Sequence, residues 1–436
     1  MRKTAVFLLM LTLLLGGCSE RSSDMFAMPQ IPETQEQLIG IVESVLERGY
    51  EYSELRSGIN RQPLQLMDLD GDGTEEGIAF LRDSVNTYKT FIYIFKRNES
   101  GFRLYDIIEG PGNDLLAVSY TDVIGQNGYE IIAEWDSGNP DNKSVRVYNL
   151  GETGTELIFD VSAISYAVCD LDGDRAGEFA TITRRNNSLY VDIYVPVDGK
   201  PRKSKSVPLS SVGGELVRVK TGNITGEKSG IFIERRVELG TAIDVVAHDG
   251  KSFVNIFPDG KVCLSDVRCE DVDGDGIIDI PEEPFESYAE NVTNRCYKWK
   301  NLTEDGKLAV TAFTYHSFAE NWYLLLPISW SQTVYAERTI EKSGCVKVHF
   351  STRESLNNDE GGFFEAPLFS VYVLTGENRK RLANEKRGFV ISETDDVIFK
   401  GEVISHSYLG TNIDEEFVKS IFKKRESEWL SEILFS

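Results

Sequence analysis

The clearest pattern along the chain is a short acidic loop followed at once by an apolar run. Residues 68–76 read Asp-Leu-Asp-Gly-Asp-Gly-Thr-Glu-Glu, with acidic side chains at positions 1, 3, 5 and 9, and residues 77–81 are apolar. The glycines at positions 4 and 6 allow the positive φ angles that a tight turn needs. An apolar run of this length is typical of a buried strand. The pattern therefore predicts a loop that leads directly into a strand.

This unit recurs. Residues 170–178 and 271–279 are further intact copies, and degenerate copies begin at Asp122 and Asn223. The five copies start at residues 68, 122, 170, 223 and 271, so the period is about 50 residues, with several β-rich runs in each. Such a period is the signature of propeller-like repeats. We therefore expect a mainly β fold, with a propeller-like domain of about five blade units over residues 60–285.

Carboxylates at alternate positions of a tight loop point towards one spot and repel one another unless a cation lies between them. A hard divalent cation with many oxygen ligands, namely calcium, fits best. We expect the ligands at positions 1, 3, 5, 7 and 9 of each intact loop, and we expect a structural role for the ion. These residues are Asp68, Asp70, Asp72, Thr74, Glu76, Asp170, Asp172, Asp174, Ala176, Glu178, Asp271, Asp273, Asp275, Ile277 and Asp279.

Two other interpretations of these loops stay open. The third loop, with Glu282 at position 12, also matches an EF-hand, although Pro281 and Pro284 oppose the exit helix that an EF-hand needs. All the loops could also be surface turns rich in aspartate and glycine that hold no metal.

The Asp-x-Asp-x-Asp-Gly pattern with an acid at position 9 resembles the FG-GAP/VCBS-type repeats of integrin α-subunits and bacterial surface proteins. The resemblance covers about half of the chain. It implies a propeller whose calcium loops brace the blades, and a role in adhesion or ligand binding. The sequence departs from the family in lacking its Phe-Gly and Gly-Ala-Pro signatures, and Arg175 replaces the glycine at position 6 of the second loop.

The N-terminus has the pattern of a lipoprotein signal. Arg2 and Lys3 precede a short apolar run, and Leu15-Gly16-Gly17-Cys18 resembles a bacterial lipobox. The resemblance implies a signal peptide at 1–17, acylation of Cys18, with chains such as palmitate, and a membrane anchor on the extracytoplasmic face. In a host with two membranes, Ser19 after the cysteine is compatible with transfer to the outer membrane. Residues 18–33 are predicted to be the lipidated cysteine and its tether.

Helical periodicity is expected at both ends of the mature chain. Leu38, Val42 and Val45 lie on one face of a predicted helix within residues 34–59, the N-terminal helix and connector. Residues 286–436 read as a smaller α+β domain, an antiparallel sheet with a C-terminal helix from Asp414 to about Leu434. Residues 307–313 and 322–327 are expected to form a hairpin in that domain.

The charge narrows the list of partners. The formal net charge is −24, and the chain offers no evident basic stripe, so nucleic acid is not expected as a ligand. The expected partners are the membrane, through the lipid, and an extracellular protein or glycan.

Enzyme motifs such as Gly-x-Ser-x-Gly, His-Glu-x-x-His and Gly-x-Gly-x-x-Gly do not occur in the sequence. The pairing of four cysteines is left open: Cys263, Cys269, Cys296 and Cys345. We therefore expect a lipid-anchored, calcium-braced binding or adhesion module without catalysis. The alternatives are a protein–protein platform in envelope assembly and a cell-surface enzyme that acts on polysaccharide, with calcium as scaffold.

Overall fold

The computed structural model describes residues 33–424, except 86, 127, 140, 239, 264–266, 283–295, 304–305 and 356–362. The expected signal peptide, Cys18 and the tether up to residue 32 lie outside the described residues. The chain divides into two compact units. The first contains the chain up to Ser119 with Ala133–Asp136 and Asn149–Glu156, and the second contains the remainder.

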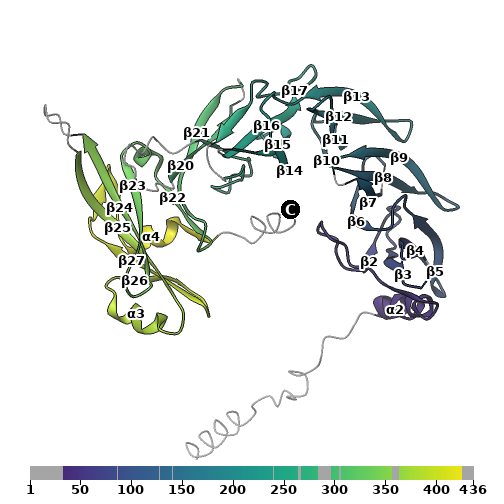
Figure 1. Ribbon diagram of the computed structural model, residues 1–436, viewed down its shortest axis with the longest axis horizontal. Helices are drawn as coiled ribbons and strands as arrows, with labels where there is room; N and C mark the ends of the chain where they lie inside the picture. The colour runs from purple at the N-terminus through teal and green to yellow at the C-terminus, as the bar shows by residue number, and fades with distance from the viewer. Residues whose placement is uncertain are drawn as a thin grey trace, which may run out of the picture. The chain divides into compact units, whose positions relative to one another are not determined.

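The first unit contains a helix and a five-stranded sheet in which β1, β3, β4 and β5 are neighbours in that order and β2 also pairs with β3 (Figure 1). Every pairing in this sheet is antiparallel. The elements are α2 (Glu33–Leu46), β1 (Tyr50–Tyr52), β2 (Leu64–Met67), β3 (Glu76–Asp83), β4 (Thr90–Asn98) and β5 (Gly101–Glu109).

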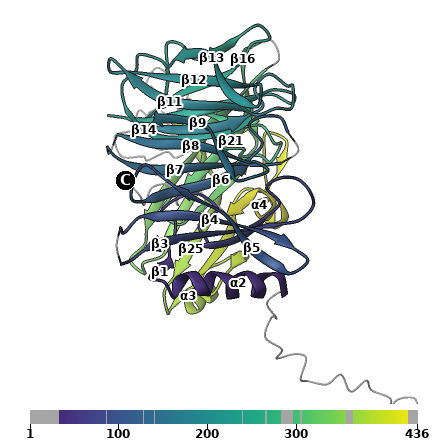
Figure 2. The ribbon, with the colours of Figure 1, turned by 90° about the vertical axis from the view of Figure 1, so that its right-hand side faces the viewer.

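The helix packs on this sheet through the apolar face that the sequence predicts. Leu38 and Val42 are fully buried in a cluster with Ala79 and Leu81 of β3. Figure 2 shows α2 beside the strands of the first sheet, in agreement with Figure 1. Gly49 follows the helix, with a φ of 95°, and donates its amide to Leu46 O.

A four-stranded sheet follows, with its strands in chain order, and its residues belong to both units. Its strands are β6 (Leu115–Thr121), β7 (Glu130–Asn139), β8 (Asn142–Leu150) and β9 (Thr155–Ala163).

Two sheets of the second unit repeat this plan of consecutive strands. One has the order β10-β11-β12-β13, and the other has the order β14-β15-β16-β17, with β18 pairing to β16. The strands are β10 (Ser165–Cys169), β11 (Glu178–Arg185), β12 (Ser188–Val197), β13 (Lys200–Pro208), β14 (Glu215–Asn223), β15 (Ser229–Val237), β16 (Gly240–His248), β17 (Phe253–Asn255) and β18 (Lys261–Cys263). Ile182 and Val191 of the β10–β13 sheet share a buried cluster with Ile231 and Val246 of the β14–β18 sheet.

The last part of the second unit has two larger sheets, ordered β19-β20-β21-β22-β30 and β23-β24-β25-β27-β26, and a small pair, β28-β29. The strands are β19 (Ile280–Glu282), β20 (Cys296–Leu302), β21 (Leu308–Ser317), β22 (Trp322–Leu326), β23 (Val334–Ile340), β24 (Val346–Ser355), β25 (Phe363–Thr375), β26 (Phe389–Glu393), β27 (Val397–Val403), β28 (Ser407–Tyr408), β29 (Thr411–Asn412) and β30 (Phe422–Lys424). The helices are η2 (Ile328–Trp330), α3 (Arg379–Glu385) and α4 (Glu415–Ile421).

The structure confirms the mainly β class and its several antiparallel sheets, and it confirms the hairpin of β21 and β22. Of the C-terminal helix expected from Asp414 to about Leu434, residues 425–434 lie outside the described residues, and within them the helix is α4. It begins after Asp414, whose carboxylate accepts the Phe417 amide, but it ends at Ile421 because the chain then enters β30 and pairs with β22. The sheet that contains β19 and β20 includes residues on both sides of position 285.

The close approach of α2 to β3 yields a stability prediction. A Cβ on Gly77 would lie 2.4 Å from Leu38 Cδ1, so Gly77→Ala must displace a fully buried side chain. We expect a loss of about 1–3 kcal/mol in the free energy of unfolding, seen as a lower melting temperature. The matched control is Gly213→Ala, whose Cβ has nothing within 4 Å. Equal melting temperatures for the two variants would contradict the packing described for α2.

Candidate metal centres

The three intact acidic loops are tight connections between antiparallel neighbours. The residue before each loop pairs with position 9 of that loop: Met67 with Glu76, Cys169 with Glu178, and Glu270 with Asp279. Glu76 begins β3 and Glu178 begins β11, while Asp279 immediately precedes β19. The last acidic side chain of each loop is therefore fixed at or beside the start of a sheet strand.

The same hydrogen bonds hold the three loops, and the first joins position 6 to position 1. The amides of Gly73, Arg175 and Gly276 donate to Oδ2 of Asp68, Asp170 and Asp271 at 3.0, 3.0 and 2.9 Å. Position 6 has a positive φ in each loop: 87° at Gly73, 77° at Arg175 and 84° at Gly276. The arginine that departs from the glycine pattern thus adopts the same left-handed turn, at a steric cost that glycine does not carry.

A second shared bond joins position 7 to position 5. The amides of Thr74, Ala176 and Ile277 donate to Oδ1 of Asp72, Asp174 and Asp275 at 2.7, 2.8 and 2.8 Å. These six residues are therefore placed within the loops as the pattern predicts, and their role as ligands stays a prediction.

A third shared bond joins position 2 to the carboxylate at position 9. Leu69 N donates to Glu76 Oε2 at 2.9 Å, Leu171 N to Glu178 Oε2 at 2.6 Å, and Val272 N to Asp279 Oδ2 at 3.0 Å. The three carboxylates are almost completely buried, with exposures of 2, 1 and 0 %. One amide does not neutralise a buried carboxylate, so each loop needs a proton or a cation at this point.

Positions 1, 3 and 9 converge in each loop. One oxygen from each of the three carboxylates lies within 4.8 Å of the others in the triads Asp68, Asp70, Glu76; Asp170, Asp172, Glu178; and Asp271, Asp273, Asp279. Calcium binds oxygen at about 2.4 Å, so two oxygens on opposite sides of the ion are about 4.8 Å apart. The triads could therefore each hold one metal ion. In the first loop, Asp68 Oδ1 is also buried and makes no hydrogen bond to the described residues.

Burial shifts the titration of the position-9 acids. Desolvation raises the pKa of Glu76, Glu178 and Asp279 to about 7. Repulsion by the neighbouring aspartates adds to this rise, and the hydrogen bond from the backbone amide opposes it. Desolvation and the nearby Asp275 also raise the pKa of Asp273. These shifts describe the metal-free loops, in which the carboxylates hold protons that a bound cation would replace.

The first loop differs from the others in having an internal cation nearby. Lys96 Nζ, from β4, lies 2.7 Å from Asp70 Oδ2. In the second and third loops, the hydrogen bonds to the first two aspartates of the triad come from backbone amides within the loop. A metal ion at the first loop must therefore compete with a lysine.

The degenerate loops show that the hydrogen bond to the position-9 carboxylate can occur without the acids at positions 3 and 5. Glu130 is 2 % exposed and accepts the Val123 amide at 2.8 Å, like the other position-9 acids, but positions 3 and 5 are Ile124 and Gln126. Ile231 occupies position 9 of the loop that begins at Asn223. In the loop that begins at Asp122, the position-9 carboxylate is thus part of the turn although positions 3 and 5 carry no acid.

The EF-hand alternative for the third loop does not match the structure, because the loop leads into β19 rather than into a helix, and Pro281 lies within that strand.

Hydrogen bonds from strands outside the third loop also hold it, and the sequence did not predict them. Thr311 Oγ1 in β21 donates to Asp279 Oδ1 at 2.9 Å, and Tyr323 Oη in β22 donates to Val272 O at 3.1 Å. The third loop is therefore tied to the sheet that follows it.

A buried ionic cluster adjoins the third loop. Arg218 of β14 is 8 % exposed and lies 2.7 Å from Glu234, and it also pairs with Glu270, the residue that precedes Asp271. In the sequence, only the acidic Glu270 beside the loop hinted at this cluster. Its partner Arg218 lies 52 residues away, and periodicity cannot locate such a pair.

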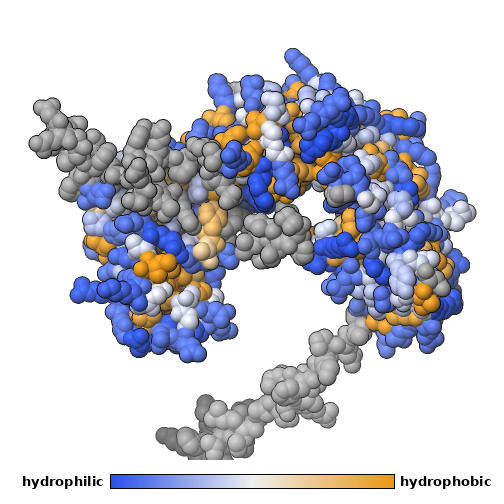
Figure 3. Space-filling view, viewed as in Figure 1, coloured by the Kyte–Doolittle hydropathy of each residue, from blue (hydrophilic) through white to orange (hydrophobic). Residues whose placement is uncertain are grey.

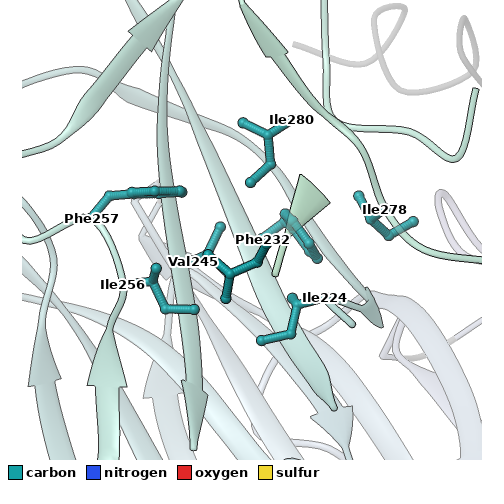
Figure 4. A pocket seen from close by; sticks show the side chains of 8 residues that line it. Ile224, Phe232, Val245, Ile256, Phe257, Ile278 and Ile280 are labelled. Carbon is teal, nitrogen blue, oxygen red and sulfur yellow. The ribbon is translucent and has the colours of Figure 1, made fainter. Parts of the chain in front are cut away.

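A small apolar cavity lies where the loops meet the β14–β18 sheet (Figure 4). Figure 4 shows Ile224, from the degenerate loop that begins at Asn223, and Ile278, from the third intact loop, facing Phe232 and Val245 of the sheet. Its volume is about 10 Å³, which is at the lower limit for one water molecule. It is a packing gap, because a ligand would not fit. The cysteines whose pairing the sequence left open, at 263, 269, 296 and 345, form no disulfide within the described residues.

Within the described part of the chain, no helix is long and apolar enough to cross a membrane. No protein-family model and no curated protein matches this chain.

Solved structures provide distant matches. A structure titled "Crystal structure of rhamnogalacturonan lyase YesW at 1.40 A resolution" shares 11% identity with a TM-score of 0.34, covering 73% of this chain and 77% of that one. A Bacillus licheniformis rhamnogalacturonan lyase, PL11, shares 12% identity with a TM-score of 0.32 over the same shares. A Lactobacillus plantarum protein shares 11% identity with a TM-score of 0.32 over 72% and 85%.

These comparisons correct the expectation that the protein is not an enzyme. That expectation rested on three missing motifs, whereas the β-rich structures that match include lyases. The absence of those motifs therefore does not separate this chain from enzymes. The matches are too distant to transfer an activity to this chain.

The buried acids yield a pH prediction for the protein in EDTA. An acid whose pKa is about 7 when folded and about 4 when unfolded keeps its proton only in the folded state between these values, so stability falls as pH rises through this window. We expect the melting temperature to fall between pH 5 and 7.5. The triple variant Glu76→Gln, Glu178→Gln, Asp279→Asn keeps the acceptors but cannot titrate. It should show a smaller fall, and an identical fall would contradict the shifted pKa values.

Proposed function

We propose that this protein is an extracytoplasmic binding or adhesion module whose β repeats are braced by three calcium ions. The observation that carries the proposal is the threefold recurrence of one construction: a triad of carboxylates within 4.8 Å, with its last member buried at or beside the start of a strand. An ion that joins the triad would fix the loop and the strand together. Calcium would then stabilise the β repeats, and the surface between the loops would be available to a protein or glycan ligand.

Calcium fits these loops better than other common metals. The side chains that converge are all carboxylates, a hard oxygen set that suits calcium, magnesium or manganese and not the softer metals that prefer nitrogen or sulfur. Magnesium requires small octahedral geometry and gives up water reluctantly, whereas calcium accepts irregular sets of six to eight oxygens from flexible loops. Raised pKa values near 7 also favour binding above neutral pH, where the acids are ionised.

We further propose that the repeats are propeller-like blades of the FG-GAP/VCBS type. In the first four repeats the acidic loop, intact or degenerate, joins two neighbouring strands of one sheet: β2 to β3, β6 to β7, β10 to β11 and β14 to β15. The fifth loop leads into β19. A constant place for the loop in each sheet supports a common blade unit.

The proposed location is the outer face of a membrane, through lipid on Cys18, with a protein or glycan ligand. Support comes from the lipobox-like sequence and from the excess of acidic residues, which suits a calcium-rich exterior because bound cations reduce self-repulsion. Action on a cell-surface polysaccharide is compatible with a binding role on the same scaffold. The assay for catalysis is the release of new sugar ends from polygalacturonate or rhamnogalacturonan by the calcium-loaded protein.

The calcium proposal predicts different effects from matched substitutions. Asp172→Ala and Asp273→Ala should each remove about one bound ion and reduce the rise in melting temperature that calcium causes, because ligand binding stabilises the folded state by mass action. Asp122→Ala is the control: it removes an acid that caps a degenerate loop, where Asp122 Oδ1 accepts the Gly125 amide at 2.7 Å.

The control should lower stability without changing the number of bound ions. Calcium counts and melting curves with 0–5 mM calcium decide between the outcomes. No calcium-dependent stabilisation of the unsubstituted protein, or the same ion count in all variants, would contradict the proposal.

Lys96 gives a further test, because it competes for the first triad. Lys96→Met removes the ammonium group that lies 2.7 Å from Asp70 and should increase calcium affinity at this loop, by about threefold to tenfold for an interaction of about 1 kcal/mol. The expected signal is a lower calcium midpoint for one of three ions. A weaker first site in Lys96→Met would show that the lysine supports the bound form.

A further inference from the structure

The edge strand β13 carries a concentration of positive charge that the overall composition hides. β13 is the last strand in its sheet, and its residues 202–205 are all exposed. The strand contributes four basic residues: Lys200, Arg202, Lys203 and Lys205. We call this set the basic edge. It corrects the expectation that the chain offers no basic stripe.

The local charge is opposite to that of the protein. Residues 184–208 contain six basic and two acidic residues, in a chain whose formal net charge is −24. One of the two acids is Asp192, which is 2 % exposed and already pairs with Arg185 and with Lys203, the latter at 2.8 Å. It therefore neutralises only part of the cluster and leaves the charges of Arg202 and Lys205 at the surface.

The backbone holds the basic edge in an extended form. Asp198 and Gly199, with φ values of 51° and 70°, make the tight turn from β12 into β13. Further along, Val207 is 3 % exposed and packs in the core with Phe253 of β17. One end of the strand is thus anchored by the turn and the other by the core, while the basic residues between them face solvent. Figure 3 shows strongly hydrophilic side chains in the region where Figure 1 places β13.

Charged residues on an edge strand, lysine above all, also prevent unwanted strand pairing. In the same protein, β5 at the edge of its sheet has Arg103 with Asp106 and Glu109, and β9 has Glu156 and Asp160. Mixed or acidic edges therefore serve for protection elsewhere. The single sign of charge on β13 calls for a further explanation.

We propose that the basic edge binds a linear acidic polysaccharide. Ammonium and guanidinium groups form strong charge-assisted hydrogen bonds with carboxylate or sulfate groups. A regular strand advances about 3.3 Å per residue, so Lys200 to Lys205 spans at most about 17 Å, and the register shift between Lys203 and Lys205 shortens this run. The span is still the length of a few sugar units in an extended chain. Ser204, exposed between Lys203 and Lys205, can bond sugar hydroxyls.

A linear chain fits this surface better than a membrane does. A planar anionic bilayer must approach a wide face of the protein, where the remaining acidic residues repel it within a screening length of about 8 Å. A thin polymer can lie along one strand and stay away from that charge. The exposed run 202–205 also lacks an apolar side chain that could enter lipid. This proposal concerns the ligand and does not depend on calcium binding by the loops.

The test measures binding of the calcium-loaded protein to dextran sulfate and to polygalacturonate, with neutral dextran as the uncharged comparison. The double variant Arg202→Gln, Lys205→Gln removes two exposed charges. Its matched control, Lys228→Gln with Lys251→Gln, removes the same charge from exposed residues outside β13. We expect the anionic polymers to bind and dextran not to bind. Affinity should fall about tenfold in the β13 variant and less than twofold in the control.

Two readouts separate a specific surface from general attraction. The slope of log affinity against log salt should become less steep in the β13 variant, because fewer counterions are released, and Arg202→Lys should retain binding. Melting temperature and calcium count should be unchanged. Equal weakening in both double variants, no binding to either anionic polymer, or binding only to phosphatidylglycerol vesicles would overturn the proposal, the last in favour of a membrane contact.

Discussion

A buried carboxylate that accepts a single backbone amide is the constraint on which the acidic loops depend. Glu76, Glu178 and Asp279 are almost inaccessible to water, and each accepts the amide of the second loop residue. This bond closes the loop and fixes the start of the following strand. It also leaves a negative charge in a poorly solvated place, and that charge is stable only with a proton or a cation. In the three intact loops, the turn and the proposed metal site thus depend on the same side chain.

The sequence predicted the local features well because they follow from short-range patterns. The five loops, the strands that follow them and the helix with Leu38 and Val42 on its buried face depend on spacing within about ten residues. The convergence of Asp170, Asp172 and Glu178 was likewise visible from alternation within one turn. Position 9 in the degenerate loop at Asp122 shows why the pattern survives in part: Glu130 still closes the turn.

Long-range features could not be read in the same way. The predicted C-terminal helix stops at Ile421 because the next residues pair with β22, about 100 residues earlier in the chain. Periodicity does not reveal such a partner. The cluster of Arg218 with Glu234 and Glu270, and the contact of Lys96 with Asp70, also join residues from separate strands. The basic edge on β13 was hidden for a different reason, since the net charge averages over the whole chain.

If three metal ions complete the loops, a crystal structure of the chain from Ser19 grown with calcium should show electron density for one ion at each triad. Each ion should lie about 2.4 Å from carboxylate oxygens of positions 1, 3 and 9. The degenerate loops at Asp122 and Asn223 should hold none. Three triads that contain only water, with unchanged hydrogen bonds in the loops, would contradict the account and show that the acidic loops are turns.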